Sequence, residues 1–118
     1  MSHIADILIA IIAALHAGFL ILEMGLWKTT FGRRIFGLTP EFAEQSARLA
    51  ANQGLYNGFL AAGLVWGLLA TTNGLAVKTF FLACVAVAGM FGGITVKRSI
   101  LVIQTLPAVV ALALLYWP

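Results

Sequence analysis

Charge and cysteine are both scarce in this chain of 118 residues. Only 9% of the residues are charged, against about a quarter in typical soluble domains, which argues against a soluble protein. The one cysteine, Cys84, excludes an internal disulfide and a paired-cysteine metal or redox motif. Because Cys84 lies inside an apolar run, we interpret it as a small packing residue.

Hydrophobic residues, in contrast, make up 62% of the sequence. They form long runs, near or above about 18 residues, and this length is typical of membrane-spanning helices rather than of a soluble core. A length of 118 residues fits one domain. The first run carries His3 and Asp6 in place of the basic segment of a secretory signal, so we expect it to be a retained helix.

These runs predict an all-α integral membrane protein, a single transmembrane domain over residues 1–118 whose four helices are arranged up-down-up-down. A basic loop, residues 28–48, follows the first helix, and Thr39–Glu41 within this loop is typical of a helix start. The "TTNG" stretch at residues 71–74 predicts a turn. The four expected spans are about 4–27, 49–70, 75–96 and 99–117.

Basic residues are divided unevenly between the two sides of this arrangement. Only Lys78 lies on the side of the chain ends. The basic residues expected on the opposite side are Lys28, Arg33, Arg34, Arg48, Lys97 and Arg98. The positive-inside rule therefore predicts that both termini are non-cytoplasmic and that the chain is a multi-pass protein of the inner (plasma) membrane. Clustering at segment ends, rather than along one face, argues against a nucleic-acid partner.

Small residues recur at four-residue spacing in the second and third predicted helices. Gly54 and Gly58 are one such pair, and Gly89 and Gly93 are another. This spacing allows helix backbones to approach closely. Packing within one chain and packing between chains both explain it, and the sequence leaves the two explanations open.

Polar residues gather at one depth of the predicted membrane domain. At about 1.5 Å of rise per residue, three helices place polar side chains roughly 6 to 9 Å inside the cytoplasmic ends of their spans. These side chains are Glu23, Asn52, Gln53 and Gln104. His16 and Asn57 lie one to two turns deeper. His16 shares a helix face with Glu23, and Gln53 shares one with Asn57, which predicts a polar pocket.

Structural roles explain the same residues without any ligand. Buried amides often serve only as hydrogen-bond partners between helices. Glu23 could reach the interface or pair with Lys28 or Arg48, and His16 could be a neutral side chain bonded to an amide. Ser99 follows Arg98 at the membrane surface and is better explained as a helix cap than as a ligand contact.

Catalytic motifs are largely missing. One histidine and one carboxylate inside the membrane fall short of the three protein ligands of a catalytic zinc site, so we expect no metal. No nucleophile elbow or phosphate-binding glycine loop is present in the sequence. Glu23 and His16 are the acid and base candidates within the predicted spans.

Three stretches resemble the bacterial membrane family called domain of unknown function 1304. They are "LHAGFLILEMGLW" at Leu15–Trp27, "NQGLYNGFLAAGL" at Asn52–Leu64 and "QTLPAVVALALL" at Gln104–Leu115. The resemblance extends over the whole chain. It implies a membrane protein and no settled activity.

A more distant resemblance connects the chain to the membrane-associated eicosanoid and glutathione metabolism (MAPEG) proteins, which are four-helix trimers. It is carried by "RLAANQGLYNGFL" from Arg48 and by "RSILVIQTLP" from Arg98. The resemblance implies a homotrimer whose site residues include Arg48, Asn52, Arg98 and Ser99. Leu55 stands where the family motif has glutamate, and this argues against glutathione as a cofactor.

We favour a MAPEG-like protein that binds a lipophilic or amphipathic small molecule in the cytoplasmic half of the bilayer, and the sequence leaves open whether it also transforms this molecule. Glu23 and His16 are the catalytic candidates. The expected ligand-binding residues are Arg48, Asn52, Gln53, Asn57, Arg98, Ser99 and Gln104. Two alternatives stay open: a small proton- or solute-coupled transporter that uses His16 and Glu23, and a non-catalytic scaffold subunit.

Overall fold

The computed structural model describes residues 2–118, and this part of the chain is all-α and contains no strand. The elements are α1 (Ser2–Leu20), the π-helical turn η1 (Ile21–Gly25), α2 (Thr30–Phe36), α3 (Pro40–Leu69), α4 (Gly74–Thr95), the π-helical turn η2 (Leu101–Thr105) and α5 (Leu106–Leu115). The predicted all-α class is confirmed. Contacts divide the chain into two units, which we call the bundle unit (residues 2–14 and 60–118) and the loop unit (residues 15–59).

The bundle unit has one apolar core, to which four helices contribute. Ile9 of α1, Leu64 of α3, Leu82 of α4 and Ala108 of α5 are all fully buried in it. Each of these helices therefore buries one apolar stripe against the other three, which is the usual way in which a helical bundle excludes water or lipid from its centre.

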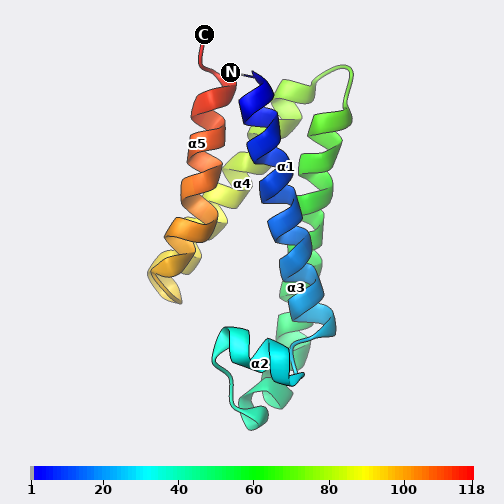
Figure 1. The fold of residues 1–118 in the computed structure, drawn as a ribbon, viewed down its shortest axis with the longest axis vertical. Helices are drawn as coiled ribbons and strands as arrows, with labels where there is room; N and C mark the ends of the chain where they lie inside the picture. Colours follow the sequence, from blue (N-terminus) through cyan, green and yellow to red (C-terminus); the bar gives the residue numbers. More distant parts are fainter. Residues whose placement is uncertain (1) are drawn as a thin grey trace. The chain divides into compact units, whose positions relative to one another are not determined.

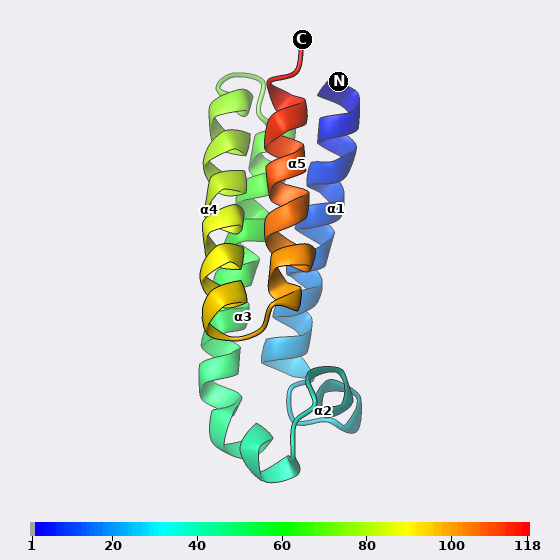
Figure 2. The ribbon, with the colours of Figure 1, turned by 90° about the vertical axis from the view of Figure 1, so that its left-hand side faces the viewer.

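Within the bundle unit, neighbouring helices run in opposite directions. Figures 1 and 2 show α4 running away from the end that carries the C-terminus and α5 returning toward it. The turn between α3 and α4 lies at the same end as the C-terminus. Asn73 in this turn adopts a left-handed conformation, with φ of 61°, which asparagine tolerates better than most residues.

Glycines allow the helices of the bundle unit to approach closely. A β-carbon on Gly63 would overlap the ring of Phe81, and one on Gly93 would overlap the side chain of Leu101. The same substitution at Gly89 would overlap the hydroxyl of Thr105. These glycines therefore pack against segments of their own chain. This supports packing within one chain, the first of the two explanations for the four-residue spacing.

An ion pair joins α1 to α4 near the end where the chain terminates. The Lys78 Nζ atom donates to Asp6 Oδ1 at 2.7 Å, and the Lys78 side chain is only 15% exposed. Close by in sequence, the hydroxyls of Thr79 and Tyr116 are 2.7 Å apart and tie α4 to α5. Polar contacts thus close this end of the bundle unit.

We expect Asp6→Asn to lower the free energy of unfolding by about 1 kcal/mol, because the largely buried Lys78 ammonium loses its charged partner. The measurement is thermal unfolding of the purified chain in detergent. Glu41→Gln, which changes an exposed carboxylate, is the matched control and should shift stability by less than about 0.5 kcal/mol. Equal shifts for the two variants would contradict a stabilising role for the ion pair.

The loop unit places α2 beside the first turns of α3, as both ribbon views show. Thr29 caps α2 by accepting a hydrogen bond from the Gly32 amide at 3.1 Å. Gly37 ends the helix with φ of 66°, a conformation that favours glycine. The sequence did not indicate α2, because its seven residues fall inside the segment predicted as a loop.

Thr39 and Pro40 start α3 as predicted. The Thr39 hydroxyl accepts a hydrogen bond from the Phe42 amide at 3.1 Å, and Pro40 is the first residue of the helix. The helix begins within the predicted basic loop and continues without a break to Leu69. Residues 40–48 of that segment are therefore helical, in agreement with a helix that starts at Thr39–Glu41 before the predicted span.

Two π-helical turns interrupt what the sequence predicts as continuous first and fourth helices. The turn η2 ends two residues before Pro107, whose missing N–H and ring are incompatible with an ordinary α-helical hydrogen bond to the preceding turn. A wider turn is one way in which a helix accommodates such a residue. No proline accompanies η1, and the sequence did not indicate it.

Within residues 2–118, two helical segments are long and apolar enough to cross a membrane, His3–Gly25 with a mean hydropathy of 2.4 and Gly74–Thr95 with a mean hydropathy of 1.9. A third apolar segment, Leu101–Leu115, is shorter. Asn52, Gln53 and Asn57 lower the hydropathy of α3. Length and composition thus support membrane association through two helices.

Candidate functional site

The turn η1 positions Glu23. Its five residues, Ile21–Gly25, form π-helical hydrogen bonds, which widen the backbone by one residue relative to an α-helical turn. Such turns are frequent at functional sites. Glu23 is only partly exposed, whereas the neighbouring Met24 is 48% exposed. Glu23 is therefore directed at the protein rather than away from it.

Asn57 of α3 holds the Glu23 carboxylate. Its Nδ2 atom donates to Glu23 Oε1 at 2.6 Å, and Asn57 is only 6% exposed. One turn earlier, a β-carbon on Gly54 would lie 3.0 Å from the Glu23 β-carbon and 2.8 Å from Met24 Cγ. Glycine at this position thus lets α3 approach η1 closely enough for the hydrogen bond to form.

A second contact ties the loop after η1 to α3. The Trp27 indole N–H donates to Ser46 Oγ at 3.0 Å, and the Ser46 hydroxyl donates to the Phe42 carbonyl at 2.6 Å. The ring of Trp27 also packs on Phe36 of α2, with 4.8 Å between the ring centres. The tryptophan therefore links the loop to both α2 and α3.

Thr29 shapes the segment that carries Lys28. Its hydroxyl donates to the Leu26 carbonyl at 2.6 Å and also caps α2. The Lys28 Nζ atom lies 3.6 Å from Glu44 Oε2, with both side chains largely exposed. An ion pair of this length and exposure contributes little to stability. The ammonium of Lys28 is thus available to another anion.

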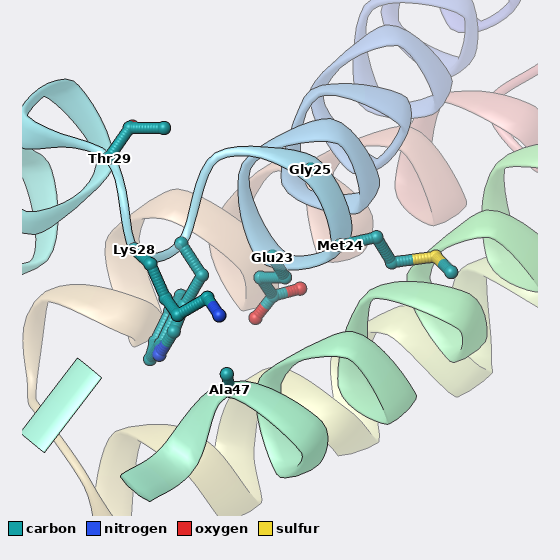
Figure 3. A pocket seen from close by; sticks show the side chains of 7 residues that line it. Glu23, Met24, Gly25, Lys28, Thr29 and Ala47 are labelled. Atoms are coloured by element: carbon teal, nitrogen blue, oxygen red, sulfur yellow. The ribbon is translucent and has the colours of Figure 1, made fainter. Parts of the chain in front are cut away.

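These residues surround a pocket of about 270 Å³ that lies wholly within the loop unit. Figure 3 shows the side chains of Glu23 and Lys28 among those that line the pocket, with Ala47 of α3 on another wall. The residues that line the pocket are Glu23, Met24, Gly25, Trp27, Lys28, Thr29 and Ala47. The pocket combines one carboxylate and one ammonium with apolar walls.

The structure brings together two of the predicted site residues in the loop unit, Glu23 and Asn57. Gln53, predicted on the same face as Asn57, is exposed, as are Arg48 and Asn52. Gln53 and Asn57 are four residues apart on α3, as predicted. The helix is rotated so that Asn57 is buried against η1, whereas Gln53 is exposed. Arg48, Asn52 and Gln53 do not line the pocket.

His16 is fully buried, and its ring lies edge-on to Phe19 with 5.4 Å between ring centres. The seven-residue spacing to Glu23 assumes a continuous α-helix, and η1 interrupts that helix between the two residues. The prediction that both share one face therefore rests on a periodicity that this segment does not keep. His16 is not among the residues that line the pocket.

The remaining predicted residues belong to the bundle unit. Arg98 is exposed in the turn after α4, and Ser99 is exposed at the start of the helical segment that leads into η2. Gln104 is partly exposed and lies within η2, so both Glu23 and Gln104 are carried by π-helical turns. The placement of these three residues in a common site with Glu23 stays a prediction.

Sequence reasoning missed most of the pocket lining. Lys28 was predicted to be a topology determinant or a partner of Glu23, whereas Trp27, Thr29 and Ala47 were not predicted as site residues. The available signal was a tryptophan, a lysine and a helix-capping threonine four to six residues after Glu23. In residues 2–118, no group of three histidine, cysteine or acidic side chains could hold a metal ion.

The structure thus defines an all-α chain with two helices of membrane-spanning length and a polar pocket at the end of one of them. The family model described as "Protein of unknown function (DUF1304)" matches residues 10–116, and the chain belongs to this family. The uncharacterised protein YpaA of Lactococcus lactis subsp. lactis (strain IL1403) is 30% identical over 87 residues, which cover 72% of this chain and 71% of the relative. No solved structure matches the chain.

Proposed function

We propose that this chain is a MAPEG-like, four-helix protein of the inner (plasma) membrane. In support, α1 and α4 have the length and apolarity of spanning helices, and α3 and α5 share the apolar core of the bundle unit with them. Large apolar residues are also strongly exposed, such as Leu69 at 76% and Ile94 at 79%, which suits a lipid environment better than water. All four helices then cross the bilayer.

In the proposed orientation both termini are non-cytoplasmic, and the basic loop of residues 28–48 lies on the cytoplasmic side. The basic residues of the loop unit support it, because cytoplasmic segments are enriched in lysine and arginine. They are Lys28, Arg33, Arg34 and Arg48. The pocket then lies where the cytoplasmic ends of the spans meet the interface.

The proposed assembly is a homo-oligomer, with a trimer favoured. Arg48, Asn52, Gln53 and Tyr56 are exposed along α3 of the single chain. Polar side chains exposed to lipid are costly, and those of spanning helices almost always face other helices or a cavity. A second copy of the chain would cover them, and hydrogen bonds between helices would stabilise the contact.

The function that we propose is binding of a lipophilic or amphipathic small molecule. The observation that carries it is the pocket beside η1, in which the Glu23 carboxylate and the Lys28 ammonium lie next to the exposed apolar surface of Met24. The charged groups would hold a polar head, and the apolar surface would hold a chain. Glu23, within hydrogen-bond distance of Asn57, is the acid or base candidate if the molecule is also transformed.

Native mass spectrometry of the gently extracted chain tests this proposal. We expect a retained amphiphile in the wild-type protein and its loss in Ala47→Phe, because the larger side chain would occupy part of a pocket of only about 270 Å³. The matched control is Ala62→Phe, which places the same ring on an exposed part of α3. The same spectra report the number of chains in each particle, for which we expect three.

Two results would contradict the binding proposal. One is a wild-type protein that retains no amphiphile after extraction or after addition of lipids. The other is equal retention by Ala47→Phe and Ala62→Phe, since the pocket would then play no part in binding. A particle of one chain would contradict the oligomer independently of ligand binding.

A further inference from the structure

Most polar side-chain groups that line the pocket are already engaged within the protein. The Trp27 N–H donates to Ser46, and the Thr29 hydroxyl donates to the Leu26 carbonyl while it caps α2. The Glu23 Oε1 atom accepts from Asn57. Two charged groups remain available to a ligand, namely the rest of the Glu23 carboxylate and the Lys28 ammonium.

These two groups favour opposite charges in the ligand. A carboxylate accepts hydrogen bonds from an ammonium group, and a lysine ammonium donates to a phosphate or carboxylate. A ligand with an anion alone would be repelled by Glu23, and a ligand with a cation alone would be repelled by Lys28. A head group with both charges avoids both repulsions.

The size of the pocket limits what it can enclose. A volume of about 270 Å³ lies just below the range of roughly 300–1,000 Å³ that is typical of sites for drug-sized ligands. It therefore suits a polar head group rather than a whole amphiphile. Met24 lines the pocket and is 48% exposed, and Ile21 in the same turn is 56% exposed, so an apolar chain could continue along η1.

We propose that the pocket binds a zwitterionic head group, whose ammonium pairs with Glu23 and whose phosphate or carboxylate pairs with Lys28. The inference rests on the proposed function and specifies its ligand class as an amphiphile of the phosphoethanolamine type. The same head group is found on a bilayer phospholipid and on a single-chain amphiphile that enters from water. Glu44, which approaches Lys28 at 3.6 Å, is the group that the ligand anion would displace.

The test uses the full chain, three probe lipids with identical acyl chains and native mass spectrometry with one probe at a time. The probes are phosphatidylethanolamine, phosphatidylglycerol and a lipid with an ammonium head and no phosphate. We expect the wild-type chain to bind phosphatidylethanolamine about tenfold more tightly than either other probe, which corresponds to one charge-assisted hydrogen bond.

Two charge-neutralising variants should shift the preference in opposite directions. Glu23→Gln keeps an oxygen that can accept from Asn57, and we expect it to favour phosphatidylglycerol. Lys28→Gln changes a side chain that is 56% exposed, so the fold should be unaffected, and we expect this variant to favour the ammonium lipid. Uniform weakening by misfolding cannot produce this crossover. Glu41→Gln and Lys97→Gln, which alter exposed charges elsewhere, should leave the preference unchanged.

Each outcome decides a separate point. Retention of all three probes without any dependence on head-group charge would overturn the zwitterion inference while binding itself stands. The same conclusion would follow if Glu23→Gln did not increase the binding of phosphatidylglycerol relative to phosphatidylethanolamine. Retention of no probe would overturn the proposed function. Phosphatidylethanolamine taken up from nanodiscs identifies a bilayer source, and uptake of lysophosphatidylethanolamine alone identifies a soluble amphiphile, with the same head-group chemistry in both cases.

Discussion

Gly89→Ala is expected to lower the free energy of unfolding by about 1–3 kcal/mol, the usual cost of overpacking a well-packed core. A β-carbon at this position would overlap the Thr105 hydroxyl and lie 2.8 Å from the Thr105 amide nitrogen. A backbone atom cannot rotate away as a side chain can, so η2 must move away from α4. The Thr105 hydroxyl would also lose its 3.3 Å hydrogen bond to the Ala86 carbonyl.

The measurement is reversible unfolding of the detergent-solubilised chain, followed by circular dichroism. Gly18→Ala is the matched control, because a β-carbon on Gly18 meets no atom within 4 Å. It should leave stability unchanged or raise it by up to about 1 kcal/mol through helix propensity. If both variants were equally stable, the close approach of α4 and η2 would not be a determinant of the fold.

Asn57→Ala is expected to lower the free energy of unfolding by about 1.5–3 kcal/mol, the range for a hydrogen bond to a charged group. The substitution removes the donor that lies 2.6 Å from Glu23 Oε1 and leaves the carboxylate without its partner in α3. It should also weaken ligand retention, because the orientation of Glu23 in the pocket depends on this contact. Equilibrium unfolding and native mass spectrometry on the same preparation measure the two effects.

Gln53→Ala provides the control, since it removes an exposed amide from the same helix one turn earlier. We expect a change of less than about 0.5 kcal/mol. A double-mutant cycle with Glu23→Ala should return a coupling of about 1–3 kcal/mol between Glu23 and Asn57. A coupling near zero would show that the two residues act independently, and the short contact would then have no energetic consequence.

Most of the helices can be predicted from sequence, because apolar runs, turn residues and helix-capping residues act locally. The "TTNG" turn separates α3 from α4, and Thr39 with Pro40 starts α3, as local capping chemistry predicts. The short helix α2 is different. It is held by the Thr29 cap and by the packing of Phe36 on Trp27, and the second contact joins residues whose proximity no local pattern indicates.

The pocket was less predictable, because helix rotation and backbone shape decide which polar residues meet. Periodicity places Gln53 and Asn57 on one face of α3, but the close approach at Gly54 turns Asn57 toward η1 and leaves Gln53 exposed. Glu23 was identified from its cost inside an apolar segment. Lys28 was predicted either at the interface or paired with Glu23. Trp27 was not predicted in the site, because its convergence with Glu23 depends on the path of residues 26–29.

The π-helical turn η1 makes the site depend on the number of residues in this segment as well as on their side chains. Such a turn is an α-helical turn with one inserted residue. Deletion of Ile21 or Leu22 would allow the segment to close as an ordinary α-helix while Glu23, Met24 and Gly25 are retained. The residues after the turn would keep roughly their present rotation relative to α1, because the wide turn already absorbs the extra residue. Glu23 lies inside the turn, so we expect its carboxylate to move relative to Asn57 even though the side chains that line the pocket are all present.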